Sequence, residues 1–157
     1  ILYSIRNEEI AYSVNGSTKI TPEELEEYKL SDKRGMMLKN YHLYLWHSPM
    51  KLNDPGTIIH KEVQRTSFNN TNVLGIKVTY EAAVGKDIWY FYFHPLSYKL
   101  MGYRFYHDET ANDGEYILLD NEIEFENIKL PATRKWFTHK DNKFLGADKL
   151  VKLEKNQ

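Results

Sequence analysis

The sequence predicts an α+β protein in which an antiparallel sheet packs over one or two helices. The stretch from Asp87 to Thr138 alternates strand-like and turn-like segments almost without interruption. Two helical segments precede it, between Thr21 and His47. The 157 residues include 12 Tyr, 7 Phe and 3 Trp, and aromatic side chains favour the half-buried positions of a sheet.

The chain opens with two short apolar runs. The first covers residues 1–3, and the second, from Ile10 to Val14, ends at the turn signal Asn15-Gly16-Ser17. Two short strands are therefore expected before the first helix.

Helix signals follow. Thr21 is a good N-cap, Pro22 suits the first helical position, and Glu24 stands where a capping box needs an acid. A second helix is expected from about Asp32 to His47, ended by Pro49. It lacks a dense Lys/Arg face, which favours packing on a sheet over lying on a membrane surface. Its broad apolar stripe consists of Met37, Leu38, Tyr41, Tyr44, Leu45 and Trp46.

After the turn at residues 53–56 the hydrophobic period changes to two, most clearly over Ile76–Ala82. One face of this strand is thus expected in the core and the other in water. Further strands are predicted over Asp87–His94, Tyr98–His107 and near Phe144–Leu153, with a polar tail at residues 154–157.

A register is visible near the end of the chain. If Glu126-Asn127 is a hairpin turn, Glu124 lies opposite Lys129. The alternating carboxylates would then form a solvent face matched to lysines rather than a catalytic acid/base pair. The same turn places Phe125 opposite Ile128 and Ile123 opposite Leu130, and the solvent face comprises Asp120, Glu122, Glu124 and Glu126.

Composition limits the function. The length and the lack of linkers or repeats predict one domain, residues 1–157. A formal charge of -1 without a basic cluster argues against nucleic acid, and no apolar run is long enough for a transmembrane segment. Because the chain begins at Ile1, we expect that an upstream segment, a signal or lipid-attachment sequence, was removed, unless the sequence was simply trimmed.

Both faces of the segment Ile88–Phe93 are aromatic, which a strand needs only when both faces are covered. Trp89, Phe91 and Phe93 would pack on the helices, while Tyr90 and Tyr92 would line a second surface with their hydroxyls near water. Two interpretations are open: packing on both faces, or an apolar ligand cavity on one.

Signatures of chemistry are weak. The six histidines lack metal-ligand spacing, Asn112-Asp113-Gly114 is typical of a turn, and no serine stands in a nucleophile elbow. We therefore expect no catalytic residue, no metal and no cofactor. The enzyme alternative is a hydrolase that uses Tyr92, His94 and His107 at one rim of the sheet.

Six motifs stand in a fixed order along the chain: Tyr41–Leu45, Pro49–Gly56, Tyr90-x-Tyr92 with His94-Pro95, Arg104-Phe105-Tyr106, Ile128–Pro131 and Phe144–Asp148. Together they resemble an uncharacterised family of envelope proteins of Bacteroidetes, over roughly residues 30–153. That family is similar to the half-barrel lipoprotein carriers LolA and LolB, in which a curved antiparallel sheet wraps over helices around an apolar cavity. The resemblance implies a binding function rather than a reaction.

The expected function is thus a non-enzymatic, periplasmic or envelope-anchored protein that shelters a lipid or a lipoprotein acyl chain between the sheet and the Asp32–His47 helix. A structural or interaction module with a filled core is a further alternative, and a cytoplasmic location stays open. The expected cavity residues are Met37, Tyr41, Trp46, Trp89, Phe91, Tyr103 and Phe105.

Overall fold

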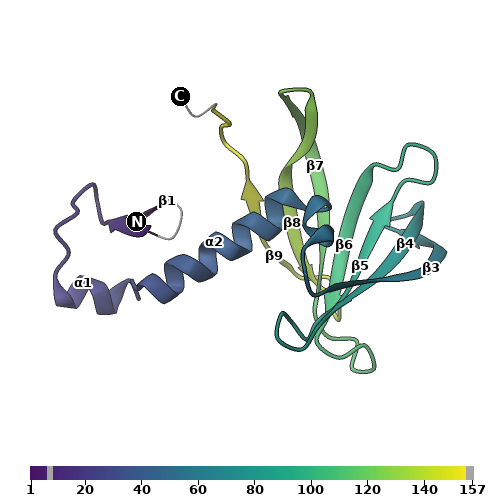
Figure 1. Ribbon diagram of the computed structural model, residues 1–157, viewed down its shortest axis with the longest axis horizontal. Helices are drawn as coiled ribbons and strands as arrows, with labels where there is room; N and C mark the ends of the chain where they lie inside the picture. Colours follow the sequence, from purple (N-terminus) through teal and green to yellow (C-terminus); the bar gives the residue numbers. More distant parts are fainter. Residues whose placement is uncertain (7–8, 155–157) are drawn as a thin grey trace. The chain divides into compact units, whose positions relative to one another are not determined.

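The structure, a computed structural model, describes residues 1–6 and 9–154 and divides into two compact units, Ile1–Lys51 and Leu52–Gln157 (Figure 1). Each unit is described here by itself. The prediction that the whole chain is one domain stays a prediction. The last three residues of the predicted polar tail lie outside the described residues.

The first unit contains the two predicted strands and the two predicted helices. The strands pair antiparallel, and Asn15 and Gly16 form the predicted turn with positive φ angles of 50° and 83°. Thr21 caps the first helix: its hydroxyl accepts from the Glu24 amide, and the Glu24 carboxylate accepts from the Thr21 amide. The elements are β1 (Leu2–Arg6), β2 (Glu9–Ser13), α1 (Pro22–Glu27) and α2 (Asp32–His47).

Helix α2 has the predicted bounds, but its burial differs from the predicted stripe. The helix contacts the β1–β2 hairpin at Gly35, where a Cβ atom would lie 2.6 Å from Cγ2 of Ile10. Leu45 is 2% exposed, whereas Met37 and Tyr41 are 57% and 37% exposed. The helix therefore packs on the hairpin partly through the close approach of Gly35 to Ile10. The sequence period predicts packing through the larger side chains instead.

In the described part of the second unit, seven strands form one antiparallel sheet in sequence order, an open curved sheet that runs from teal to yellow in Figure 1. Every neighbour in space is a neighbour in sequence, as short connections favour. The predicted antiparallel sheet is confirmed. After a short 3₁₀ helix at Met50–Asn53, the strands are β3 (Thr57–Phe68), β4 (Thr71–Tyr80), β5 (Ile88–Phe93), β6 (Leu100–Tyr106), β7 (Glu115–Phe125), β8 (Ile128–Thr138) and β9 (Phe144–Lys149).

The predicted register of the β7–β8 hairpin is confirmed at all three pairs, including Glu124 opposite Lys129. Glu126 and Asn127 have φ angles of 48° and 65°. Two successive left-handed residues match the twist of a two-residue hairpin, so the turn fixes this register.

Two predicted strand ends are wrong. Strand β6 begins at Leu100 rather than Tyr98, because Tyr98 adopts φ 55° in a turn closed by its amide donating to the His94 carbonyl. Strand β9 ends at Lys149 rather than Leu153, and the Leu150 amide then donates to the Ala132 carbonyl.

Consecutive residues in β5 show that both faces of the sheet are covered, since Phe91 is 0% and Tyr92 is 5% exposed. Burial of the ring raises the pKa of Tyr92, and the prediction that its hydroxyl lies near water stays a prediction. We call the two sides the tryptophan face, with Trp89, Phe91, Tyr103 and Phe105, and the tyrosine face, with Tyr90, Tyr92, Arg104, Tyr106 and Tyr116.

Candidate functional site

Four of the predicted cavity residues meet on the tryptophan face. The β5–β6 register sets Trp89 opposite Phe105 and Phe91 opposite Tyr103. The Trp89 ring lies 4.9 Å from Phe105, 5.9 Å from Tyr103 and 6.0 Å from Phe91, measured between ring centroids. Phe91 and Tyr103 are 5.4 Å apart. The four rings form one continuous aromatic surface.

Polar groups border this surface. Tyr103 is 1% exposed, and its hydroxyl lies beside the side chain of Arg134. Burial raises the pKa of Tyr103 to about 12, and the positive charge of Arg134 opposes that shift. Arg134 is itself 0% exposed and donates from Nη1 to the Pro131 carbonyl at 2.9 Å. A hydroxyl and a positive charge thus lie beside the aromatic rings.

The other three predicted cavity residues belong to helix α2 in the first unit. Met37 and Tyr41 are exposed, and Trp46 is partly buried. Their place in a ligand cavity stays a prediction.

The tyrosine face is covered by Phe68 from the end of β3. The Phe68 ring stacks on Tyr92 at 4.4 Å with an interplanar angle of 19°. Gly102 makes room for it: a Cβ atom there would collide with the Phe68 ring and lie 2.6 Å from the Ile117 carbonyl oxygen. The glycine therefore permits an aromatic ring to lie flat on the sheet.

Arg104 lies between these rings and a pocket. Its guanidinium carbon is 5.6 Å from the Phe68 ring centroid and 5.4 Å from that of Tyr92. Nη1 donates to the Tyr106 hydroxyl at 3.1 Å. Within residues 1–6 and 9–154, no carboxylate pairs with Arg104, and its buried Nε has no acceptor. The guanidinium of Arg104 therefore lies against two aromatic rings and one hydroxyl group.

His139, just after β8, stands beside Arg104. Its ring stacks on Tyr106 at 4.5 Å and contacts Tyr116 at 5.8 Å. Its Nε2 is buried and has no hydrogen-bond partner in the described part of the chain. Burial, followed by the positive charge of Arg104, lowers the pKa of His139 to about 4, so the imidazole is neutral at pH 7.

These side chains line a polar pocket of about 570 Å³, which we call the arginine pocket. The sequence singled out neither Arg104 nor His139 for this role. The two-residue spacing of Arg104 and Tyr106 does indicate a shared face, but the approach of His139 depends on the β7–β8 pairing. The lining residues are Ser67, Phe68, Asn69, Asn70, Arg104, Tyr116, His139 and Asn142.

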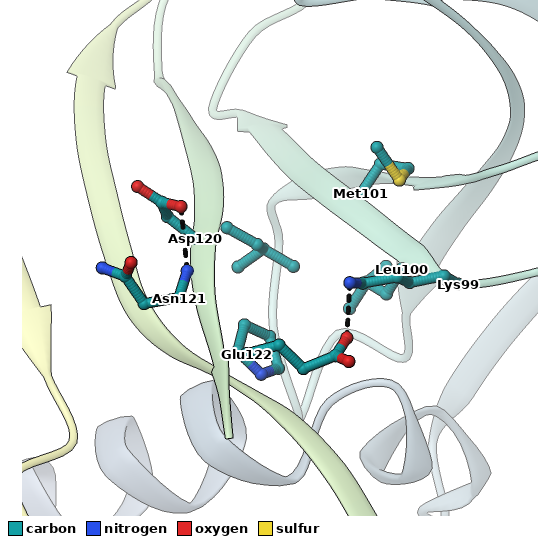
Figure 2. Close-up of a pocket in the computed structure, with 8 residues that line it drawn as sticks. Lys99, Leu100, Met101, Asp120, Asn121 and Glu122 are labelled. Atoms are coloured by element: carbon teal, nitrogen blue, oxygen red, sulfur yellow. Dashed lines mark hydrogen bonds and ion pairs between the residues drawn. The ribbon is translucent and has the colours of Figure 1, made fainter. Parts of the chain in front are cut away.

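A second pocket, of about 350 Å³, lies between β6, β7 and β8 (Figure 2). Its charges are already paired, since Lys99 binds Glu122 and the Asp120 carboxylate accepts from the Asn121 amide at 2.8 Å. The Lys99 ammonium lowers the pKa of Glu122. Paired charges make this pocket a weaker candidate for a charged ligand.

The predicted matching of carboxylates to lysines holds at two positions of β7. Asp120 pairs with Lys135 at 2.8 Å, and Glu122 lies 3.9 Å from Lys129 as well as beside Lys99. These exposed ion pairs support the interpretation of a solvent face.

A further polar cluster is satisfied internally. Glu109 accepts hydrogen bonds from the Lys77 ammonium at 2.7 Å and from the Tyr90 hydroxyl. These bonds lower the pKa of Glu109, and the Glu109 carboxylate raises that of Lys77. The cluster ties the β6–β7 loop to the sheet.

The comparison with protein families gives one match. Residues 8–153 match a family of unknown function, DUF6503. The chain belongs to this family. The match extends over almost the whole chain, and it includes the range of roughly residues 30–153 in which the motifs of the resemblance lie. Neither the comparison with curated proteins nor that with solved structures gives a match to this DUF6503 chain.

The three residues of the hydrolase alternative are not brought together in this DUF6503 chain. His94 accepts from the Ser97 amide at 3.2 Å in the β5–β6 turn. His107 pairs with Asp87 at 2.7 Å at the other end of the same two strands, roughly 23 Å away at the rise of a strand. Tyr92 is buried between them.

Two further searches concern metals and membranes. Among residues 1–6 and 9–154, no three His, Asp or Glu side chains are grouped to hold a metal ion. Of the helices in these ranges, none has the length and apolar character needed to cross a bilayer.

Proposed function

We propose that this DUF6503 protein is a non-enzymatic binding protein of the cell envelope, which holds a lipid or a lipoprotein acyl chain on its tryptophan face. The observation that supports this proposal is the continuous aromatic surface on a curved antiparallel sheet, formed by Trp89, Phe91, Tyr103 and Phe105. A LolA-like half-barrel is the finer form of this proposal. Its envelope location rests on the motif order described above.

The energetics suit an acyl chain. Each buried CH₂ group contributes roughly 0.8 kcal/mol, so an apolar ligand needs no ion pair to bind. Trp89 and Phe105 are only partly buried, while Phe91 and Tyr103 are covered. The partly exposed pair is therefore the side from which a chain would reach the other two rings.

The Tyr103 hydroxyl adds a preference among apolar ligands. The hydroxyl can donate a hydrogen bond to an ester or carboxyl oxygen of a ligand, and Arg134 supplies a positive charge beside it. The proposal therefore favours an amphiphile, with its chain on the rings and its polar group at Tyr103, over a plain hydrocarbon.

Native mass spectrometry of protein purified without detergent tests this proposal. We expect bound lipid mass, and binding of a hydrophobic fluorophore that oleate displaces. Trp89→Ala should weaken that binding at least tenfold, whereas Phe144→Ala, on an exposed ring of β9, should leave it unchanged. Absence of both lipid mass and fluorophore binding would refute the proposal.

The second candidate is a structural or interaction module with a filled core. The burial of both Phe91 and Tyr92 favours it, because a strand whose two faces are already buried by the protein leaves no apolar surface that a ligand must cover. It predicts that neither lipid nor fluorophore binds while the Trp89→Ala variant loses stability.

A further inference from the structure

We propose that the arginine pocket on the tyrosine face binds a small hydroxylated carboxylate, such as a hydroxy acid or a uronic acid. This site lies on the opposite side of the sheet from the tryptophan face and does not depend on the lipid proposal. It rests on the placement of Arg104, His139 and three asparagines.

Arg104 supplies the charge and the shape. Its guanidinium is oriented by Phe68, Tyr92 and the Tyr106 hydroxyl, and no described carboxylate neutralises it. The planar fork of an arginine matches the two oxygens of a carboxylate. A partly buried charge without a counterion is costly, and a bound anion would offset that cost.

The surrounding charges select a monoanion. Arg104 is the charged residue among those that line the arginine pocket, and His139 is neutral at pH 7. The negative charge of Asp113, on the β6–β7 loop, raises the pKa of His139 and so partly offsets Arg104. One positive charge matches a carboxylate better than a doubly charged phosphate.

His139 provides a response to binding. Desolvation and the positive charge of Arg104 both oppose its protonation, and the rings of Tyr106 and Tyr116 lie against its own ring. A carboxylate placed beside Arg104 would remove part of that opposition. The pKa of His139 should therefore rise when the pocket is filled.

The remaining lining selects hydroxyl groups next to the carboxylate. Asn69, Asn70 and Asn142 come from hairpin turns and have φ angles of 48°, 60° and 55°. Each side-chain amide offers donors and an acceptor to ligand hydroxyls. Phe68 and Tyr116 supply ring surfaces for the C–H groups of such a ligand.

Proton NMR of the histidine rings tests the proposal in the whole chain. The probes are glucuronate, acetate, glucose and inorganic phosphate. Glucuronate should shift the His139 ring signals with saturation and raise the pH midpoint of their titration, and acetate should do so more weakly. Glucose, which has the hydroxyls without the carboxylate, should have no effect.

Matched arginine variants locate the binding. Arg104→Lys keeps a positive charge but loses the fork, and should weaken glucuronate at least tenfold. Arg65→Lys changes an exposed arginine outside the pocket lining and should leave affinity unchanged. If Arg104→Lys does not fold, Asn70→Ala is the second test and should weaken glucuronate but not acetate.

Other outcomes would overturn the proposal. They are no saturable His139 shift with glucuronate or acetate at tens of millimolar, equal affinity in Arg104→Lys, or tighter binding of phosphate than of glucuronate. Oleate binding is measured separately. Loss of lipid binding with glucuronate binding intact, or the reverse, distinguishes the failure of one proposal from that of the other.

Discussion

The two faces of the sheet are built from alternate residues of the same strands. Both faces are buried at their centres, but their side chains differ in chemistry. Phe91 and Tyr92 are adjacent and are 0% and 5% exposed. The rings around Phe91 contact one another, whereas Tyr92 lies beside the Arg104 guanidinium, which lines a polar pocket. The exposed fraction of a face therefore does not indicate which kind of ligand it can bind. The polar atoms buried in that face do indicate it.

The largest expected loss of stability follows a substitution on the tryptophan face. Phe91→Ala removes a fully buried ring and should lower the free energy of unfolding by about 4 kcal/mol. Urea denaturation measures this. Phe144→Ala, at a ring that is 55% exposed, should cost about 1 kcal/mol or less. Equal losses in the two variants would mean that the tryptophan face is not a packed core.

On the tyrosine face, the largest effect is expected at Gly102. A Cβ atom there meets the Phe68 ring and the Ile117 backbone, so Gly102→Ala should cost about 3 kcal/mol. Gly146→Ala is the matched control, because nothing lies within 4 Å of its added Cβ atom. Urea denaturation of both variants makes the comparison, and a stable Gly102→Ala protein would show that Phe68 does not lie flat on the sheet.

His139 should make the tyrosine face sensitive to acid. Its folded-state pKa of about 4 lies below the ordinary value of 6.5, so the unfolded chain binds the proton more tightly. Stability is therefore present above pH 6.5 and is lost as pH falls from 6.5 towards 4, by on the order of 1 kcal/mol after allowing for solvent.

Unfolding at pH 7 and at pH 4.5 measures this loss. His139→Gln should reduce the difference between the two pH values. A difference of the same size in His139→Gln and in the unchanged protein would assign the acid sensitivity to other groups.

His107, whose ring lies 5.3 Å from Phe105 at the edge of the tryptophan face, should act with the opposite sign. The Asp87 carboxylate raises the pKa of His107. The pair thus stabilises below the ordinary value of 6.5, and this contribution is lost as pH rises through the folded-state pKa.

The His107 effect should be the smallest, a few tenths of a kcal/mol, because the ion pair is exposed and screened. His107→Gln should lower stability at pH 6 more than at pH 8.5 in urea denaturation at low salt. An equal loss at both pH values would mean that the ion pair does not contribute.

The predictions from sequence that the structure confirms concern features set by residues close together in the chain. The capping box at Thr21 and the two-residue turn at Glu126-Asn127 depend on residues within a few positions, and the turn then fixes the pairing of β7 with β8. Period-two alternation likewise placed Trp89 and Phe91 on one face. The exposure of Met37 on α2 escaped prediction, because the close contact at Gly35 involves a strand far away in sequence.

In the candidate sites, too, some features are set by neighbouring residues and others by contacts between distant parts of the chain. The sequence by itself predicted an antiparallel sheet, the pairing of β7 with β8 and the shared face of Trp89 and Phe91, because alternation and short turns are properties of neighbouring residues. Only the tertiary structure placed Phe68 over Gly102, brought His139 beside Arg104 and, in the part of the chain that it describes, paired no carboxylate with that arginine. These features depend on which strands pair and how the sheet curves, and the side chains involved are separated by tens of residues.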